Sequence, residues 1–275
     1  MLSSLVLVAC GGSDTQTVTT GKQSPAVGAS FDLRIGVAAP TTGDLSRLGI
    51  AGDKAVGLAQ DRLSAVLGDA AANITITTQT VDTESTDSGA VAAVKKLTRD
   101  GATCIVGPWS SSAVSAVDSV LSERKVPIVS PATQEGDLGS QGGKLAFGIA
   151  PADSSEDAAS ATGTEPTGPE FSSATAFFAD VYEDAPGTKQ RAPFDQEAFD
   201  AAVLCGLAAI DAGSSDGDQI AQRIGAVSGP PGVKITPEGL SDAVQALRNG
   251  DDVDYEGVSG PIDITSEGGA TPIGN

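Results

Sequence analysis

Short apolar runs alternate with longer stretches of helical periodicity along the first 150 residues. The runs are bounded by glycine, proline or aspartate, which is typical of strands. Because strands and helices alternate, the pattern predicts a mostly parallel α/β sheet with helices on both faces. The expected strands are Phe31–Ala39, Asn73–Val81, Ala102–Val106, Val126–Val129 and Leu145–Ile149.

The expected helices carry apolar residues three and four positions apart. The first half has them at Gly49–Leu67, at Ser88–Thr98 and from Ser110 onward, and Gly101 follows the second as a left-handed stop. After Pro151 a stretch without periodicity predicts a linker, and the chain then becomes mostly helical. The later elements are expected at Glu170–Glu183, Asp195–Ala212, Gln219–Val227 and Pro237–Arg248, with a loop and a last strand over Tyr255–Ile264.

Two hydroxyl clusters follow neighbouring strands of this predicted sheet. Ser110–Ser112 stand where a helix begins, and Ser130–Thr133 form a polar turn after the next strand. Ligands of open parallel sheets bind beyond the carboxyl ends of the strands, and a helix N-terminus favours an anion. The pattern therefore indicates a site for a small carboxylate. The alternative is that the serines only cap the helix and the second cluster only makes a turn.

The charge balance and the residue types exclude several kinds of function. The 36 acidic and 16 basic residues give a net charge of −20, which argues against nucleic acid and against anionic lipid. The chain has no histidine, so a Ser-His-Asp or Cys-His arrangement is impossible. We find no phosphate-binding loop, no dinucleotide fingerprint and no metal-ligand spacing. We therefore expect no cofactor, no metal and no enzyme activity.

The first thirty residues predict export and anchoring. The apolar start ends in Leu7-Val8-Ala9-Cys10 before two glycines, which is typical of the end of a secretory signal. It resembles the bacterial lipoprotein lipobox, whose cysteine is acylated after cleavage. Residues 11–30 are rich in Ser, Thr, Gly and Gln and predict a flexible tether. The alternative is a chance apolar start with a buried cysteine.

The two remaining cysteines leave two interpretations open. Cys104 lies in an apolar strand and Cys205 in a helix, so both could be buried thiols that act as small hydrophobes. In an exported protein the same two residues could form a disulfide.

Five segments occur together, in order, as in one known family. They are IGVAAPTTG at 35–43, VDT at 81–83, IVGP at 105–108, VPIVSPAT at 126–133 and YEGVSGPID at 255–263. In these segments the chain resembles the type I periplasmic binding proteins of branched-chain amino acid ABC transporters, the leucine/isoleucine/valine-binding group. The likeness covers about residues 32–153 and 163–268. It implies a Rossmann-like lobe, an amino-acid ligand and an ABC permease as partner.

The resemblance also implies which residues contact the ligand. In that family the amino-acid carboxylate is held by a serine after the Gly-Pro turn and by residues of the Ser-Pro-Ala-Thr turn. The corresponding positions are Ser110, Ser111, Ala132 and Thr133, with the second turn uncertain by one residue. Leu48 stands where the family often has an aromatic residue, and Asp153 stands at an acidic position that faces the ammonium group.

The sequence departs from the family by a large gap. A second lobe of about a hundred residues or more would normally follow Asp153, yet sequence typical of the region after that lobe begins at Gly163. The expected division is a partial signal at 1–10, a tether at 11–30, a ligand-binding lobe at 31–268 with a short linker at 154–162, and a tail at 269–275.

Two functions follow from this organisation. The first is a lipid-anchored substrate-binding component on the extracytoplasmic face of the cell envelope, with most of its second lobe missing. The second is a single-lobe interaction or sensory module that dimerises or docks on another protein and no longer transports. Neither involves nucleic acid.

Overall fold

The computed structural model describes residues 30–70, 73–134, 138, 145–151, 172–265 and 269–270. Structural statements below concern these residues. The predicted signal (1–10) and linker (154–162), all but the last residue of the predicted tether (11–30), and most of the predicted tail (269–275) lie outside them. No single helix of the described part is long and apolar enough to cross a membrane. Asp195–Ala212 and Gly217–Val227 meet that test only as a pair bent by 109°.

A five-stranded sheet organises the first half of the chain. Its strands are β1 (Phe31–Ala39), β2 (Ile74–Asp82), β3 (Cys104–Val106), β4 (Ile128–Ser130) and β5 (Ala146–Gly148). They lie in the order β2-β1-β3-β4-β5, and every neighbouring pair is parallel. The predicted parallel α/β sheet is confirmed.

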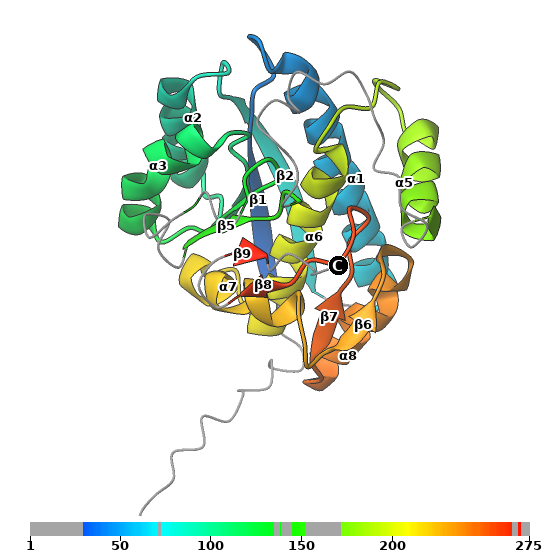
Figure 1. Ribbon diagram of the computed structural model, residues 1–275. Helices are drawn as coiled ribbons and strands as arrows, with labels where there is room; N and C mark the ends of the chain where they lie inside the picture. The colour runs from blue at the N-terminus through cyan, green and yellow to red at the C-terminus, as the bar shows by residue number, and fades with distance from the viewer. Residues whose placement is uncertain are drawn as a thin grey trace, which may run out of the picture.

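Helices cover both faces of this sheet, as the alternating pattern predicted (Figure 1). One face carries α2 (Asp87–Arg99) and α3 (Ser111–Arg124), which pack against each other. The opposite face carries the remaining helices, with α6 at the centre and α1 beside it. These are α1 (Ser46–Asp69), α5 (Ser172–Asp184), α6 (Asp195–Ala212), α7 (Gly217–Ile224) and α8 (Leu240–Asn249).

Small elements complete the second half and differ most from the predictions. The single-turn 3-10 helices η4 (Gly225–Val227) and η5 (Pro237–Gly239) flank a strand, β6 (Val233–Ile235), that the pattern does not predict. β6 pairs in parallel with β7 (Val253–Tyr255). β8 (Ile264–Thr265) pairs antiparallel with β9 (Gly269–Ala270). A three-residue strand with two exposed positions is too short to show an alternating pattern.

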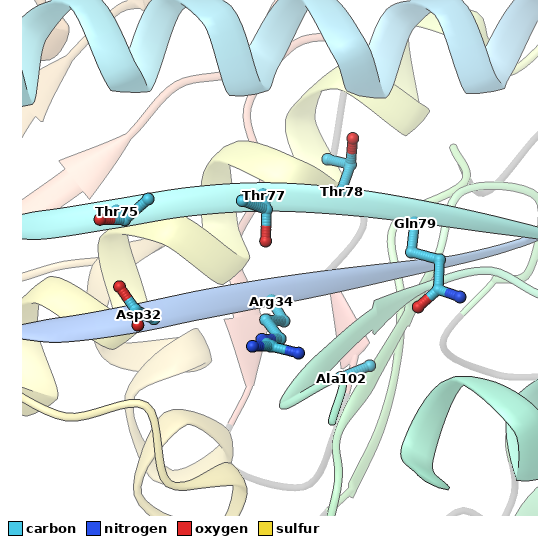
Figure 2. Close-up of a pocket in the computed structure, with 7 residues that line it drawn as sticks. All are labelled: Asp32, Arg34, Thr75, Thr77, Thr78, Gln79 and Ala102. Carbon is cyan, nitrogen blue, oxygen red and sulfur yellow. The ribbon is translucent and has the colours of Figure 1, made fainter. Parts of the chain in front are cut away.

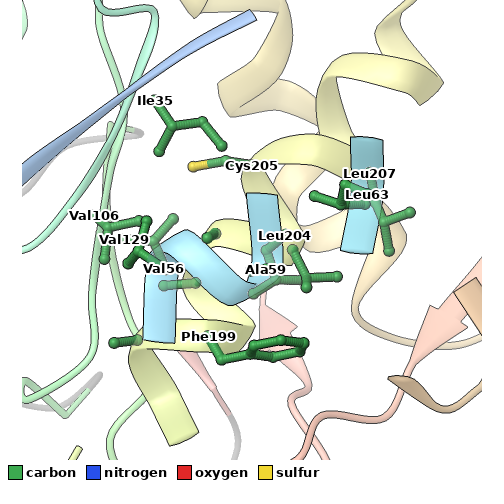
Figure 3. Close-up of a cluster of buried hydrophobic side chains, with 14 of the residues drawn as sticks. Ile35, Val56, Ala59, Leu63, Val106, Val129, Phe199, Leu204, Cys205 and Leu207 are labelled. Atoms are coloured by element: carbon green, nitrogen blue, oxygen red, sulfur yellow. The ribbon is translucent and has the colours of Figure 1, made fainter. Parts of the chain in front are cut away.

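The larger hydrophobic core lies between the sheet and α6. Every residue of α6 except Ala212 is buried, which is typical of a helix surrounded by other elements. Figure 3 shows side chains from β1, β3, β4, α1 and α6 meeting in this layer. Labelled members are Ile35, Val56, Ala59, Leu63, Val106, Val129, Phe199, Leu204, Cys205 and Leu207.

The core on the opposite face is smaller because β1 presents small residues there. Gly36 and Ala38 alternate with the large residues of the other face. A Cβ at Gly36 would lie 3.1 Å from Leu97 Cδ1, so glycine lets α2 approach the sheet closely. Other members of this layer are Ala90, Val94, Val117, Val120, Leu121 and Ile128.

A disulfide joins β3 to α6. Cys104 and Cys205 are bonded, with their Cα atoms 6.0 Å apart, inside the usual range for disulfides. The interpretation as two separate thiols is therefore wrong. The sequence could not decide this, because the cysteines are 101 residues apart and meet only once α6 packs on the sheet.

Asp200 of α6 fixes the segment that follows β7. Its carboxylate accepts hydrogen bonds from Tyr255 Oη (2.8 Å), Val258 N (2.9 Å), and Ser259 N (2.8 Å) and Oγ (2.6 Å). Burial raises the pKa of Asp200 to about 6, although these hydrogen bonds favour the charged form. The motif YEGVSG at 255–260 is thus held to the buried helix.

Candidate functional site

Four turns gather at the carboxyl edge of the sheet. They follow β1, β2, β3 and β4, and parallel pairing places the ends of these strands on one side. Helix α6 also begins at this edge, because a Cβ on Gly52 in the second turn of α1 would lie near both Trp109 and Ala198. This edge is where an open parallel sheet binds its ligand.

Asp82 ties the turn after β1 to the turn after β2. Its Oδ1 accepts hydrogen bonds from Thr41 N (2.9 Å), Thr42 N (3.2 Å) and Glu84 N (2.9 Å), and its Oδ2 from Thr42 Oγ1 (2.5 Å). Partial burial opposes ionisation, but the Thr42 hydroxyl and these N–H groups together hold the pKa of Asp82 below its usual value. The Asp82 carboxylate therefore holds together the two turns that shape the site. An aspartate at the end of a strand is a recognisable signal for such a turn.

The serines after β3 begin α3 as predicted. Ser110 is the N-cap residue, and its Oγ accepts a hydrogen bond from Ala113 N at 3.3 Å. Ser112 Oγ donates to Asp87 Oδ1 at 2.8 Å, which links α3 to the start of α2. Ser111 is half-buried in the first turn. The capping role is confirmed for Ser110, and contact of Ser110 or Ser111 with a ligand stays a prediction.

The turn after β4 is locked to the turn after β3. Ser130 Oγ hydrogen-bonds the carbonyl oxygen of Pro108 (2.6 Å) and Thr133 Oγ1 (2.8 Å). Ser130 and Thr133 are both fully buried. The Thr133 hydroxyl thus lies inside the turn. A ligand contact of this residue stays a prediction, and it would require the hydroxyl to exchange partners.

Leu48 and Ala132 occupy apolar surroundings. Leu48 lies in the first turn of α1 with 2 % of its surface exposed, and it belongs to the larger core. Ala132 is half-buried and packs against the same core. Their ligand contacts also stay predictions. Asp153, the expected ammonium partner, and Cys10, the expected lipidation site, lie outside the described residues.

Trp109 is a residue at this edge that the sequence analysis missed. It follows Pro108, is 4 % exposed, and its indole lies against Gly107 and Gly52. Its Nε1 has no hydrogen-bond partner among the described residues. The chain's only tryptophan, directly between the Gly-Pro turn and the serines, was the available signal.

Glu197 is a buried carboxyl in the first turn of α6. Burial raises its pKa to about 8, and the nearby carboxylates of Asp200 and Asp195 act in the same direction. Asp195 is paired with Arg191, whose Nε lies 2.6 Å from Asp195 Oδ2. Near neutral pH the Glu197 carboxyl is mostly protonated and adds little charge to this edge.

A polar hollow lies on the sheet away from this edge. It has a volume of about 400 Å³. Figure 2 shows Asp32 and Arg34 on β1 and Thr75, Thr77 and Gln79 on β2 around it, while Thr78 points to the other side of the sheet. Arg34 Nη1 donates to the carbonyl oxygen of Asp100 at 3.2 Å. These lining side chains are exposed, which explains their polarity, and none belongs to the predicted site.

Comparisons with known proteins point to one family. Residues 32–164 match the family model described as periplasmic binding protein. No match was found among curated proteins. The fold and this match support the type I periplasmic binding protein family, which the resemblance indicated.

Several solved structures have a fold similar to that of this chain. The branched-chain amino acid transporter substrate-binding protein LivJ of Streptococcus pneumoniae, in complex with isoleucine, matches at 16% identity and a TM-score of 0.62, covering 87% of this chain and 94% of that one. The leucine-binding protein LivK of Thermotoga maritima matches at 16% identity and a TM-score of 0.57, covering 86% and 93%. A substrate-binding protein of Desulfitobacterium hafniense in complex with Leu matches at 12% identity and a TM-score of 0.55, covering 87% and 95%. The fold is thus that of branched-chain amino acid substrate-binding proteins.

Proposed function

We propose that this chain is an extracytoplasmic substrate-binding component for an ABC transporter of branched-chain or similar small amino acids. The observation that carries the proposal is the joined edge of the sheet, where the turns after β3 and β4 meet beside the start of α3. The family fold supports the same role, because its relatives include proteins solved with isoleucine and with leucine. The disulfide supports an extracytoplasmic location, since disulfides persist in oxidising compartments.

The ligand we expect is an amino acid held by its carboxylate. The N–H groups at the start of α3, together with the Ser111 hydroxyl, would donate hydrogen bonds to the carboxylate, because a helix N-terminus is a favourable place for an anion. Thr133 and Asp153 are the further proposed contacts. No step of this function needs a cofactor or a reacting side chain.

We further propose that the site is a half-site. The described residues contain one five-stranded sheet, and the other sheets among them have two strands each. If the second lobe of an intact binding protein supplies two hydrogen bonds to charged groups of the ligand, a half-site loses about 3–6 kcal/mol of binding free energy. At about 1.4 kcal/mol per tenfold, affinity falls by roughly 10²–10⁴. A ligand that a closed clamp holds at about micromolar concentration would bind here at about millimolar concentration.

Titration calorimetry with leucine tests this directly. We expect a Kd of about 1 mM for the purified monomer and a further loss on Ser111→Ala. Ser122→Ala is the matched control, because Ser122 is exposed in the last turn of the same helix. Micromolar binding by a demonstrated monomer would contradict the half-site. Binding that is equal in the Ser111 and Ser122 variants would contradict the assigned site.

The lipid anchor has its own experiment. Cys10 follows Leu-Val-Ala and precedes small residues, so we propose that it becomes the acylated N-terminus. Mass spectrometry of the membrane fraction should find a diacylglyceryl-modified cysteine, and Cys10→Ser should release the protein. A soluble product that retains residues 1–9 would rule out the anchor.

A second candidate is a single-lobe interaction module. The open carboxyl edge favours it, because a second copy or another protein could supply the opposing wall. In that case leucine affinity should rise with protein concentration, and sedimentation should show a dimer or a complex. Two permease genes and two ATPase genes beside this one would instead favour transport.

A further inference from the structure

The indole ring of Trp109 is held between two glycines at the carboxyl edge of the sheet. A Cβ at Gly107, directly after β3, would lie 2.7 Å from Trp109 Cζ3. A Cβ at Gly52 of α1 would lie 2.5 Å from Trp109 Cζ2 and 3.2 Å from Trp109 Cε2. A side chain at either glycine would collide with the ring. The fold therefore fixes the indole between the end of β3 and α1.

The side of the indole that carries the N–H group faces α1. Cε2, the carbon bonded to Nε1, lies against Gly52, whereas Cε3 and Cζ3 lie against Gly107. Gly52 follows the predicted ligand contact Leu48 by four residues, so the two share one face of α1. Ser110, the N-cap of α3, directly follows Trp109. The indole thus lies between α1 and the start of α3.

The indole N–H is a buried donor without an acceptor. Trp109 is 4 % exposed, and its Nε1 has no partner within the described part of the chain. A buried tryptophan N–H usually finds a partner, because an unpaired one loses the hydrogen bond that water makes in the unfolded chain. Phenylalanine would fill the space without this cost, and the chain has seven phenylalanines and one tryptophan. An acceptor brought by a ligand would satisfy the N–H.

The polar groups of the neighbouring turns do not supply that acceptor, because they pair with one another. Asp82 binds the turn after β1, and Ser130 hydrogen-bonds Thr133. Gln196 Nε2, in the first turn of α6, is a second buried donor that has no partner in the described ranges. This edge therefore offers N–H donors from several elements, which favours an anionic ligand group over a cationic one.

We propose that Trp109 is a ligand-binding residue whose indole N–H donates a hydrogen bond to the carboxylate of the ligand. The inference rests on the proposed function, which places that carboxylate at the start of α3. Because Nε1 is buried, a carboxylate oxygen must enter between the turn after β3 and α1. The aliphatic chain of the ligand would then lie beside the ring and Leu48. The expected ligand class is a small aliphatic carboxylate.

The single tryptophan gives this proposal a direct readout. The NMR spectrum of the nitrogen-labelled full chain contains one indole N–H signal. Leucine and isocaproate, which is leucine without its ammonium group, should each shift this signal saturably at about millimolar concentration. Leucinamide, which lacks the carboxylate, should leave it unchanged. This titration uses the wild-type protein, so it does not depend on the folding of a variant.

Trp109→Phe removes the N–H and keeps an aromatic ring. It should weaken isocaproate binding by at least about tenfold, as expected for a hydrogen bond to a charged group. The amide signals of Ser110–Ser112 report the affinity in the variant and in the wild type. Ser122→Ala, in the last turn of the same helix, is the control and should bind isocaproate like the wild type.

The outcomes separate this inference from the proposed function. Ligand shifts at Ser110–Ser112 with an unmoved indole signal would overturn the role of Trp109 and leave the function standing. Equal affinities of wild type and Trp109→Phe would do the same. An indole shift with isocaproate but none with leucine would support the role of Trp109 and contradict amino-acid binding. No response to either ligand would overturn both.

Discussion

The two faces of the central sheet are built differently. The face under α6 has large side chains at Leu33, Ile35 and Val37 of β1, a disulfide, and a helix buried on all sides. The face under α2 and α3 has Gly36 and Ala38, and it ends in the polar hollow around Arg34. We call the face under α6 the thick face and the face under α2 and α3 the thin face. The thin face nevertheless carries the serines that begin α3. We therefore expect stability to be concentrated on the thick face.

Removal of the disulfide should have the largest effect on the thick face. A crosslink that closes a loop of 101 residues stabilises a fold by about 4–5 kcal/mol in the chain-entropy model. We expect Cys104→Ala/Cys205→Ala to lose about that amount in urea unfolding. Reduced wild-type protein is the control and should unfold at a similar urea concentration. A loss below about 1 kcal/mol would show that the crosslink does little for this face.

Core truncations should separate the two faces next. Phe199 is fully buried and contacts Phe178 edge-to-face at 5.5 Å between ring centres. Phe199→Ala should cost about 3–5 kcal/mol. Val94→Ala on the thin face should cost about 2 kcal/mol, because it removes less apolar volume. Equal losses, measured at constant m-value, would remove the distinction between the faces.

The pH dependence of stability should come from the thick face. A carboxyl group with a raised pKa in the folded state binds more protons when folded than when unfolded. Its contribution to the free energy of unfolding therefore falls as pH rises from the unfolded-state pKa to the folded-state pKa. For Glu197 that window runs from 4.5 to about 8. Between pH 5 and 8, Glu197 should lower the free energy of unfolding of the wild type by about 3 kcal/mol. Glu197→Gln should remove this part of the pH dependence. Glu123→Gln, at an exposed position, should keep the wild-type slope.

The polar hollow should show the smallest effect. Arg34 is exposed and makes one described hydrogen bond, to a carbonyl oxygen. Arg34→Gln should change the free energy of unfolding by no more than about 0.5 kcal/mol. A larger loss in the same urea experiment would mean that this corner supports the fold.

The sequence predicted long elements better than short ones. The bounds of β1 and α6 agree with the predictions residue for residue, because both are long and strongly apolar. Helix α1 begins at Ser46, three residues before the predicted start. Leu45 precedes it and provides no side-chain cap, so the sequence carried no start signal there.

The candidate site was predicted in outline only. The turns after β3 and β4 meet at one edge, as parallel pairing requires. The direction of each hydroxyl depends on contacts between turns. The sequence could not show that Thr133 bonds Ser130 inside the turn, or that Trp109 lies against Gly52 of α1.

The disulfide also changes the connectivity of the molecule. Cys104 precedes residues 152–171 in the chain and Cys205 follows them, so the bond closes a covalent ring that contains this stretch. A single cut anywhere in the ring opens it but releases no fragment. A proteolytic cut within 152–171 would therefore leave β3 and α6 covalently joined. The crosslink thus keeps the two halves of the core together when the chain between them is cut.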